Sequence, residues 1–182
     1  MGEFRRVEER IVHTGFLIEV AEATFEAPDG TRFERDVVHH PGAVSVVPIL
    51  HDGSVLLVRQ YRAAIDRELL EVPAGKRDVH GEDPAVTAHR ELAEEVGLRA
   101  GRVEKLAEFY NSPGFCDEHS YVFLALDLEE VTSDAQGPEE RHMTIEQIAL
   151  AEVPALIASG EISDAKTIIG LCLARQRVEG LP

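Results

Sequence analysis

The chain has 182 residues, 44% of them hydrophobic, which suits one compact domain with a real core and room for a small appendage. Its 34 Asp and Glu residues outnumber its 18 Lys and Arg residues, and the net charge of −16 argues against binding to nucleic acid or to a membrane surface. With two cysteines, no apolar run of membrane-spanning length and no apolar signal segment near the start, the sequence predicts a protein of the reducing cytoplasm.

The first 42 residues are predicted to form a small antiparallel β hairpin. Residues 15–26 and 31–39 have strand-like composition, and the turn-forming residues Pro28, Asp29 and Gly30 lie between them. An isolated hairpin buries little, so we separate this region, 1–42, from a main domain at 43–182.

The main domain begins with two strand-like stretches, 43–50 and 54–61, that meet at a turn around Gly53. Their runs of β-branched residues predict central strands of a sheet. A third stretch, 68–72, leads into a polar loop that ends at Asp83.

A helix of about four turns is predicted after that loop. Asp83 is its expected N-cap, Pro84 its first residue and Gly97 the residue just past its end. At about 100° per residue, one side is expected to pack and the opposite side to carry the polar residues. The packing residues are Ala85, Ala88, Leu92 and Val96, and the residues expected across from them are Arg90, Glu91, Glu94 and Glu95.

The rest of the chain continues the alternation of strands and helices. Strand-like segments at 103–110 and 119–126 are separated by a polar loop, and the acidic residues 127–141 are predicted to form a mobile surface loop. A strand at 143–148 and two helices, 152–159 and 163–178, complete the prediction.

Three glutamates of the predicted central helix indicate a metal site. Glu91, Glu94 and Glu95 repel one another, and a like-charged pair at i, i+4 spacing costs a few tenths of a kcal/mol. A bound cation is the simplest compensation, and hard oxygen ligands favour Mg²⁺ or Mn²⁺ over zinc.

Gly75, Glu82 and residues 90–98 resemble the Nudix box, G-x5-E-x7-R-E-U-x-E-E-x-G-U, in which U is an apolar residue. Six residues instead of five separate Gly75 from Glu82, and the rest matches without change. The extra residue falls in the loop before the helix, where it leaves the helix glutamates in place. The resemblance implies an α/β fold of the Nudix type, an α/β/α sandwich around a mixed sheet, preceded here by the N-terminal antiparallel β hairpin.

The resemblance to the Nudix hydrolases also implies a reaction. Mg²⁺, or alternatively Mn²⁺, would be held by the backbone carbonyl of Ala74 and by Glu91, Glu94 and Glu95. Arg90 would orient the carboxylates, so it joins Glu94 among the expected catalytic residues. The metal would neutralise a diphosphate and lower the pKa of a bound water that cleaves it.

Shorter segments are similar to the ADP-ribose pyrophosphatases of that family. Pro113 lies sixteen residues past Gly97, as in the loop that marks this group, and residues 60–62, 71–75 and 160–162 also match. The group's pattern implies a homodimer formed through residues 1–42. It also implies substrate-binding roles for Phe16, Arg35, Arg62, Glu71, Pro113 and Glu118.

Two of these roles are more specific. Phe16 would stack on adenine, and Arg35 would contact the base or the diphosphate. The alternative for Phe16 is a structural one, in which its ring plugs the inner face of the hairpin, since aromatic residues in strands usually belong to a core.

A glutamate of the acidic loop is expected to activate the attacking water, because residues 138–141 are similar to the loop that supplies this base in the group. Glu140 is favoured and Glu139 is the alternative. An ordinary acidic loop without catalytic function is the competing interpretation. A loop that closes over the substrate would also exclude bulk water.

The sequence therefore predicts a Mg²⁺-dependent enzyme that splits ADP-ribose, a small-molecule nucleoside diphosphate sugar, into AMP and ribose 5-phosphate. Alternative substrates are GDP-mannose or a broader range of nucleoside diphosphate compounds and modified nucleotides. A third possibility is a non-catalytic Nudix domain that senses ADP-ribose. Such a sensor would be expected to have lost box carboxylates, and this chain retains them.

Overall fold

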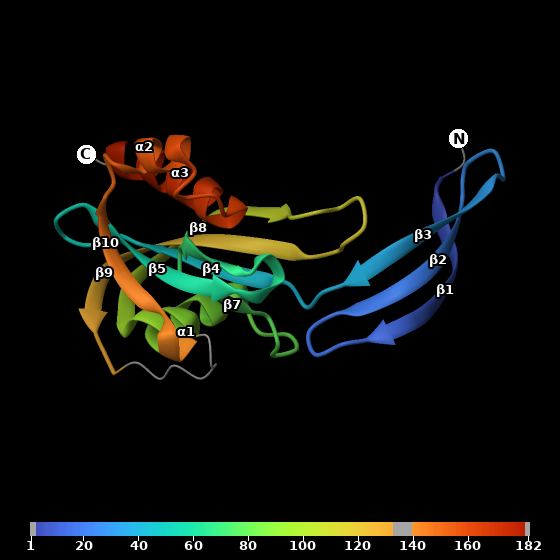
Figure 1. Cartoon of the computed structure of the whole chain (residues 1–182), viewed down its shortest axis with the longest axis horizontal. Helices are drawn as coiled ribbons and strands as arrows, with labels where there is room; N and C mark the ends of the chain where they lie inside the picture. Colours follow the sequence, from blue (N-terminus) through green and yellow to red (C-terminus); the bar gives the residue numbers. More distant parts are fainter. Residues whose placement is uncertain (1–2, 133–139, 181–182) are drawn as a thin grey trace. The chain divides into compact units, whose positions relative to one another are not determined.

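The computed structural model describes residues 3–132 and 140–180. They form two compact units: unit 1 comprises the residues up to 42 together with 109–119, and unit 2 comprises 43–108 and the described residues from 120 onward (Figure 1). The strands are β1 (Arg5–Thr14), β2 (Glu19–Glu26), β3 (Arg32–His39), β4 (Ala43–Pro48), β5 (Ser54–Arg62), β6 (Arg67–Glu71), β7 (Ala74–Lys76), β8 (Leu98–Tyr110), β9 (His119–Glu130) and β10 (Thr144–Ala149). The helices are α1 (Pro84–Val96), α2 (Val153–Ser159) and α3 (Ala165–Glu179), with short 3₁₀ turns at Ala63–Ile65 and Glu140–His142.

Unit 1 is built on a three-stranded antiparallel sheet in the order β1-β2-β3. The predicted hairpin is present as β2 and β3, which pair from Glu19 with His39 to Glu26 with Arg32. Strand β1 was not predicted, because it is rich in charged residues and every one of its residues is exposed. The segment 109–119 joins this unit through β3, where the Val38 N–H donates to the Phe115 carbonyl at 2.7 Å.

Unit 2 contains two sheets. The four-stranded sheet has the order β7-β4-β9-β8 and is mixed, since β4 pairs antiparallel with β7 and parallel with β9. The second sheet, β10-β5-β6, is antiparallel. The sequence predicted one mixed sheet; in the structure β4 and β5 lie in different sheets, and Ile49, just after β4, forms a bridge with Val55 of β5.

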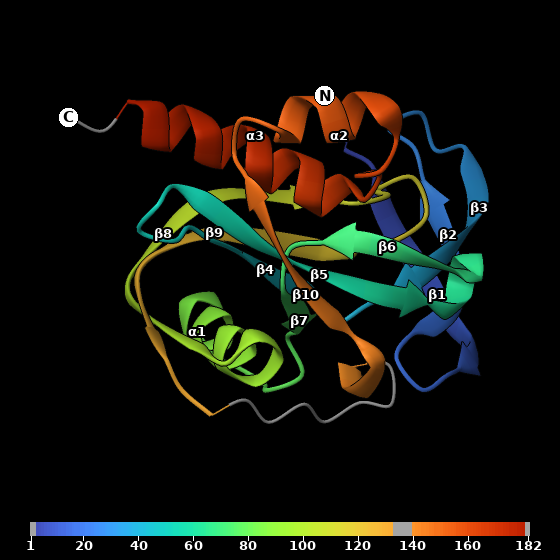
Figure 2. The ribbon, with the colours of Figure 1, turned by 60° about the vertical axis from the view of Figure 1, so that its left-hand side comes forward.

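Helices cover both sides of these sheets, which confirms the predicted α/β/α architecture. Helix α1 lies on one side, and α2 and α3 lie on the other (Figures 1 and 2). On the α1 side the core includes Val44, Val46, Leu92 and Phe123. On the α3 side Leu171 and Ala174 are fully buried.

The predicted helix ends are confirmed. Asp83 caps α1 by accepting a hydrogen bond from the Ala85 N–H at 2.8 Å, and Gly97 ends it with φ at 65°.

Strands β8 and β9 are longer than predicted, and β9 includes residues 127–130 of the predicted acidic loop. Short β7 was expected to be loop. No helix in the described part of the chain is long and apolar enough to span a membrane.

Candidate active site

The three glutamates lie on α1, which packs against β4 and β7. Glu91 and Glu95 are each only 7% exposed. The expectation that the polar residues lie across from the packed side is therefore wrong for these two glutamates. At about 100° per residue, position 95 is only about 20° from Ala88 around the helix axis, so its side chain points toward the sheet.

Strand β7 lies directly against this glutamate pair. The Ala74 N–H donates a hydrogen bond to Glu95 Oε2 at 2.9 Å. Gly75 is so close to Glu91 that an added Cβ would overlap its carboxylate. A backbone segment therefore contacts two acidic side chains of the helix, and this contact requires glycine at position 75.

Arg90 binds the acidic side chains around it. Its guanidinium lies 2.8 Å from Glu91, 3.4 Å from Glu94 and 3.6 Å from Glu82. Burial alone would lower the pKa of Arg90, but the charges of Glu91 and Glu94 outweigh burial and raise it. Arg90 thus holds Glu91 and Glu94 in place, and Glu82 joins the cluster despite the extra residue in its loop.

Arg62 and Glu71, two predicted substrate-binding residues, are paired with each other. The Arg62 Nε and Nη2 atoms donate to the two Glu71 carboxylate oxygens at 2.7 and 2.6 Å. This pairing is the main reason that the pKa of Arg62 is raised, and the charge of Glu95 adds to the effect. Lys166 of α3 also binds Glu71.

Lys166, Asp164 and Thr167 were missed by the sequence analysis. Asp164 is the N-cap of α3 and accepts hydrogen bonds from the Thr167 N–H at 2.9 Å and from its hydroxyl at 2.6 Å. The signal in the sequence was an Asp followed three residues later by Thr, ahead of an apolar run. It predicts a helix start and gives no indication of the contact with β6.

The other predicted substrate-binding residues belong to unit 1. Arg35 lies over the Phe33 ring, with Cζ 4.8 Å from the ring centroid, and together with Pro113 it lines a cavity of about 480 Å³. The Glu118 carboxylate lies 4.0 Å from His40 Nδ1. Phe16 is 100% exposed, so the alternative in which it plugs the hairpin is wrong.

The structure does not test the two candidates for the general base. Glu139 lies outside the described residues, and Glu140 begins the 3₁₀ turn Glu140–His142. Their assignment stays a prediction from the sequence.

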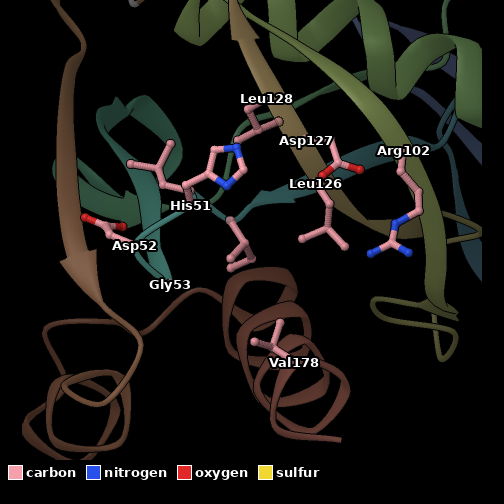
Figure 3. A pocket seen from close by; sticks show the side chains of 10 residues that line it. His51, Asp52, Gly53, Arg102, Leu126, Asp127, Leu128 and Val178 are labelled. Atoms are coloured by element: carbon pink, nitrogen blue, oxygen red, sulfur yellow. The ribbon is translucent and has the colours of Figure 1, made fainter. Parts of the chain in front are cut away.

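Another cavity lies in unit 2, and none of the predicted site residues lines it. It has a volume of about 550 Å³ and lies between the turn after β4 and the end of α3. Figure 3 shows His51, Asp127 and Arg102 around it and Val178 on the helix side.

The NUDIX domain family model matches residues 39–168 of this chain. The chain belongs to the Nudix family. The predicted family membership is thus confirmed, and the match includes α1 and β7 with the glutamates, Arg90 and Gly75.

Curated relatives cover most of this Nudix chain. The ADP-ribose pyrophosphatase of Bacillus subtilis (strain 168) is 36% identical over 165 residues, 91% of this chain and 89% of that protein. The ADP-ribose pyrophosphatase of Mycobacterium tuberculosis is 38% identical over 169 residues, 93% of this chain and 82% of that protein. The GDP-mannose pyrophosphatase of Citrobacter koseri is 31% identical over 156 residues, 78% of this chain and 81% of that protein.

A solved structure of an ADP compounds hydrolase has the same fold. Its TM-score is 0.86, with 99% of this chain and 96% of that chain covered and 24% sequence identity. At this level of identity the likeness shows the fold alone, and it supports the arrangement of sheets and helices described above.

Nudix hydrolases generally require a divalent metal ion, and the donor atoms present here fit one. As they stand, the described residues contain no group of three or more His, Cys, Asp or Glu side chains in a metal-binding arrangement. In this structure Glu91 and Glu94 pair with Arg90, and Glu95 accepts a hydrogen bond from the Ala74 N–H. The clustered carboxylates beside the bare backbone of Gly75 are nevertheless hard oxygen ligands of the kind that Mg²⁺ and Mn²⁺ prefer.

Proposed function

We propose that this chain hydrolyses the diphosphate bond of ADP-ribose to give AMP and ribose 5-phosphate, with Mg²⁺ as the cofactor. The observation that carries the proposal is the packing of Ala74 and Gly75 against Glu95 and Glu91, beside the ion pairs of Arg90. The names and the 36% and 38% identities of the two ADP-ribose pyrophosphatases support this substrate.

In this proposal the box residues hold the cofactor. Glu91, Glu94, Glu95 and the Ala74 carbonyl would bind Mg²⁺, or Mn²⁺ in its place. When bound, the ion supplies charge neutralisation of the diphosphate and a water of lowered pKa. Arg90 keeps the glutamates oriented, and Glu140, or alternatively Glu139, takes the proton from the attacking water.

The proposed substrate-binding residues are those that the sequence indicated. Phe16 is proposed to stack on adenine and Arg35 to contact the base or the diphosphate. The full exposure of Phe16 leaves its ring accessible to a ligand. Arg62, Glu71, Pro113 and Glu118 complete the proposed set.

We also propose a homodimer formed through residues 1–42, located in the cytoplasm. Strand β1 is at an edge of its sheet, so one side of its backbone can pair with another chain, and it exposes Val7, Ile11 and Val12. Cys116 and Cys172 are free thiols, which fits a reducing compartment. Light scattering after size-exclusion chromatography would measure the mass in solution, and a monomer would contradict the dimer.

GDP-mannose is the second candidate substrate, favoured by the relative from Citrobacter koseri. ADP-ribose is preferred because its two relatives are more similar and align over more of this chain. A non-catalytic sensor is disfavoured, since the ion-paired glutamate cluster is intact.

The test is a substrate panel with Mg²⁺. ADP-ribose, GDP-mannose, other nucleoside diphosphate sugars and dinucleotides are incubated with the purified protein, and products are separated by chromatography. We expect ADP-ribose to have the highest kcat/KM and to yield AMP. Hydrolysis of another substrate without turnover of ADP-ribose would overturn the substrate assignment, and absence of all turnover would support the sensor.

Two variants test whether turnover depends on the glutamate cluster. Glu94→Gln keeps the size of the side chain but removes a negative charge, and we expect turnover to fall by orders of magnitude. Glu104→Gln is the matched control, because Glu104 pairs with Arg177 and Arg102 outside the glutamate cluster.

A further inference from the structure

A buried carboxylate in unit 2 has two cationic partners from different elements. Glu71, at the end of β6, is 1% exposed. Arg62, at the end of β5, binds both of its oxygens, and Lys166 of α3 binds Oε2. Two cations from different elements therefore bind this one buried carboxylate.

The two cations differ in exposure and in their other partners. The Arg62 side chain is 38% exposed, whereas that of Lys166 is 15% exposed. Lys166 also contacts Asp164 at 2.9 Å. Lys166 is therefore fixed between two carboxylates, while Arg62 pairs with Glu71 and is partly exposed.

Asp164 does not depend on Lys166 alone. It accepts two hydrogen bonds from Thr167 at the N-terminus of α3, where the helix dipole also favours a negative charge. Although burial opposes it, the charge of Lys166 and these hydrogen bonds keep the pKa of Asp164 below its ordinary value. Lys166 can thus act as the counterion of Glu71 while Asp164 keeps its hydrogen bonds to Thr167.

Glu71 adjoins the segment that contacts the box glutamates. The next residue, Val72, donates its N–H to Thr167 Oγ1 at 3.0 Å, and Ala74 and Gly75 then contact Glu95 and Glu91. Because Arg62 binds Glu71, three residues before Ala74, it lies near the segment that contacts the box glutamates, where the diphosphate of the proposed substrate would be bound.

We propose that Lys166 is the permanent counterion of Glu71, so that Arg62 can exchange Glu71 for a phosphate of the substrate. A guanidinium binds carboxylate and phosphate with the same fork of donors. If Arg62 left without Lys166 present, a buried carboxylate would lose its only cation, which is strongly unfavourable. Lys166 is thus a positioning residue that acts through Glu71 and Arg62. This inference rests on the proposed function.

The test measures ADP-ribose affinity by calorimetry in EDTA, where no turnover occurs, and KM and kcat in Mg²⁺. In Lys166→Met, Arg62 must stay with Glu71, and we expect affinity to weaken and KM to rise about tenfold, with a smaller change in kcat. In the double variant Glu71→Gln/Lys166→Met no buried charge retains Arg62, so affinity should be clearly higher than in Lys166→Met alone.

Controls separate this role from a purely structural one. Lys166→Arg keeps the cation and is expected to bind like the wild type. Arg175→Met removes a cation from the same helix, where it pairs with Glu179, and should change nothing. Thermal unfolding of each variant verifies that it is folded at the assay temperature.

Two results would overturn the inference: wild-type affinity in Lys166→Met, or a double variant that binds as weakly as the single one. If the wild type hydrolysed neither ADP-ribose nor GDP-mannose in Mg²⁺, the proposed function would fail and this inference with it. By contrast, if the wild type binds ADP-ribose and Lys166→Met binds it equally well, only the role proposed for Lys166 fails.

Discussion

Gly75 of β7 and Glu91 of α1 are in direct contact, with no room for a side chain between the strand and the carboxylate. Gly75 does not have a positive φ, so the need for glycine comes from the close approach and not from the backbone conformation. The neighbouring Ala74 is bonded to Glu95, and the two contacts together fix the strand on the acidic side of the helix.

The first prediction concerns this contact. Gly75→Ala would push the Glu91 carboxylate or β7 away, and because this carboxylate ends a flexible side chain, the loss of stability should be at the low end of the about 1–3 kcal/mol that overpacking costs. We expect kcat/KM for ADP-ribose to fall at least about a hundredfold, since small displacements in an active site have effects of this size. Steady-state kinetics and urea unfolding measure the two effects. Unchanged kinetics would show that the contact has no part in catalysis.

The cap of α1 is predicted to matter for stability and little for chemistry. Asp83 accepts a hydrogen bond from the Ala85 N–H, and loss of such an N-cap costs about 1 kcal/mol. Asp83→Ala should lower the free energy of unfolding by that amount, whereas Asp83→Asn retains an acceptor and most of the stability. A drop in kcat at a temperature where Asp83→Ala is fully folded would contradict this separation.

His39 is predicted to make the stability of unit 1 depend on pH. Its Nδ1 lies 2.6 Å from Asp117 and its Nε2 lies 3.0 Å from Glu9. The hydrogen bond with Asp117, helped by Glu9 and opposed by burial, raises the pKa of His39 above its ordinary value. Because the pKa is higher in the folded state, the stabilisation is complete below about pH 6.5 and is lost as the pH rises through the folded-state value.

Thermal unfolding between about pH 5.5 and 8.5 measures this effect. Both carboxylates have lowered pKa values, chiefly because hydrogen bonds and the charge of His39 outweigh burial, so they stay ionised across this window. The wild type should lose stability as the pH rises, and His39→Ala should lose less over the same range. Parallel curves for the two proteins would contradict the prediction.

A further prediction tests the packing of α3. A Cβ at Gly170 would lie 2.9 Å from Val47 Cγ2 and 3.0 Å from Val122 Cγ1. Replacing glycine by alanine inside a helix normally stabilises it by up to about 1 kcal/mol, but overpacking costs about 1–3 kcal/mol, so Gly170→Ala should be destabilising overall. Urea unfolding measures the sign. Cys172→Ala, at an exposed site of the same helix, is the control.

Helix α1 shows how far the sequence could be interpreted. Asp83, Pro84 and Gly97 are local signals, and they placed both ends of the helix correctly. The pattern of apolar residues did not reveal that Glu91 and Glu95 are buried, because their burial depends on β7, a three-residue strand without a signal of its own.

Other differences also arise from long-range contacts. Strand β1 is charged and wholly exposed, so no apolar alternation marks it, and its pairing with β2 defines it. The partnership of Glu71 with Lys166 joins residues 95 positions apart, which no local pattern indicates. The box glutamates and Arg90 were predictable because their spacing within one helix is itself the signal.

The central claim is that the glutamates of α1 hold a divalent cation, and a titration with Mn²⁺ followed by electron paramagnetic resonance tests it most directly. We predict saturable binding by the wild type and affinity weakened at least about tenfold in Glu95→Gln, whose amide oxygen still accepts from the Ala74 N–H but lacks the charge. A wild type that takes up no Mn²⁺, with or without ADP-ribose present, would contradict the claim.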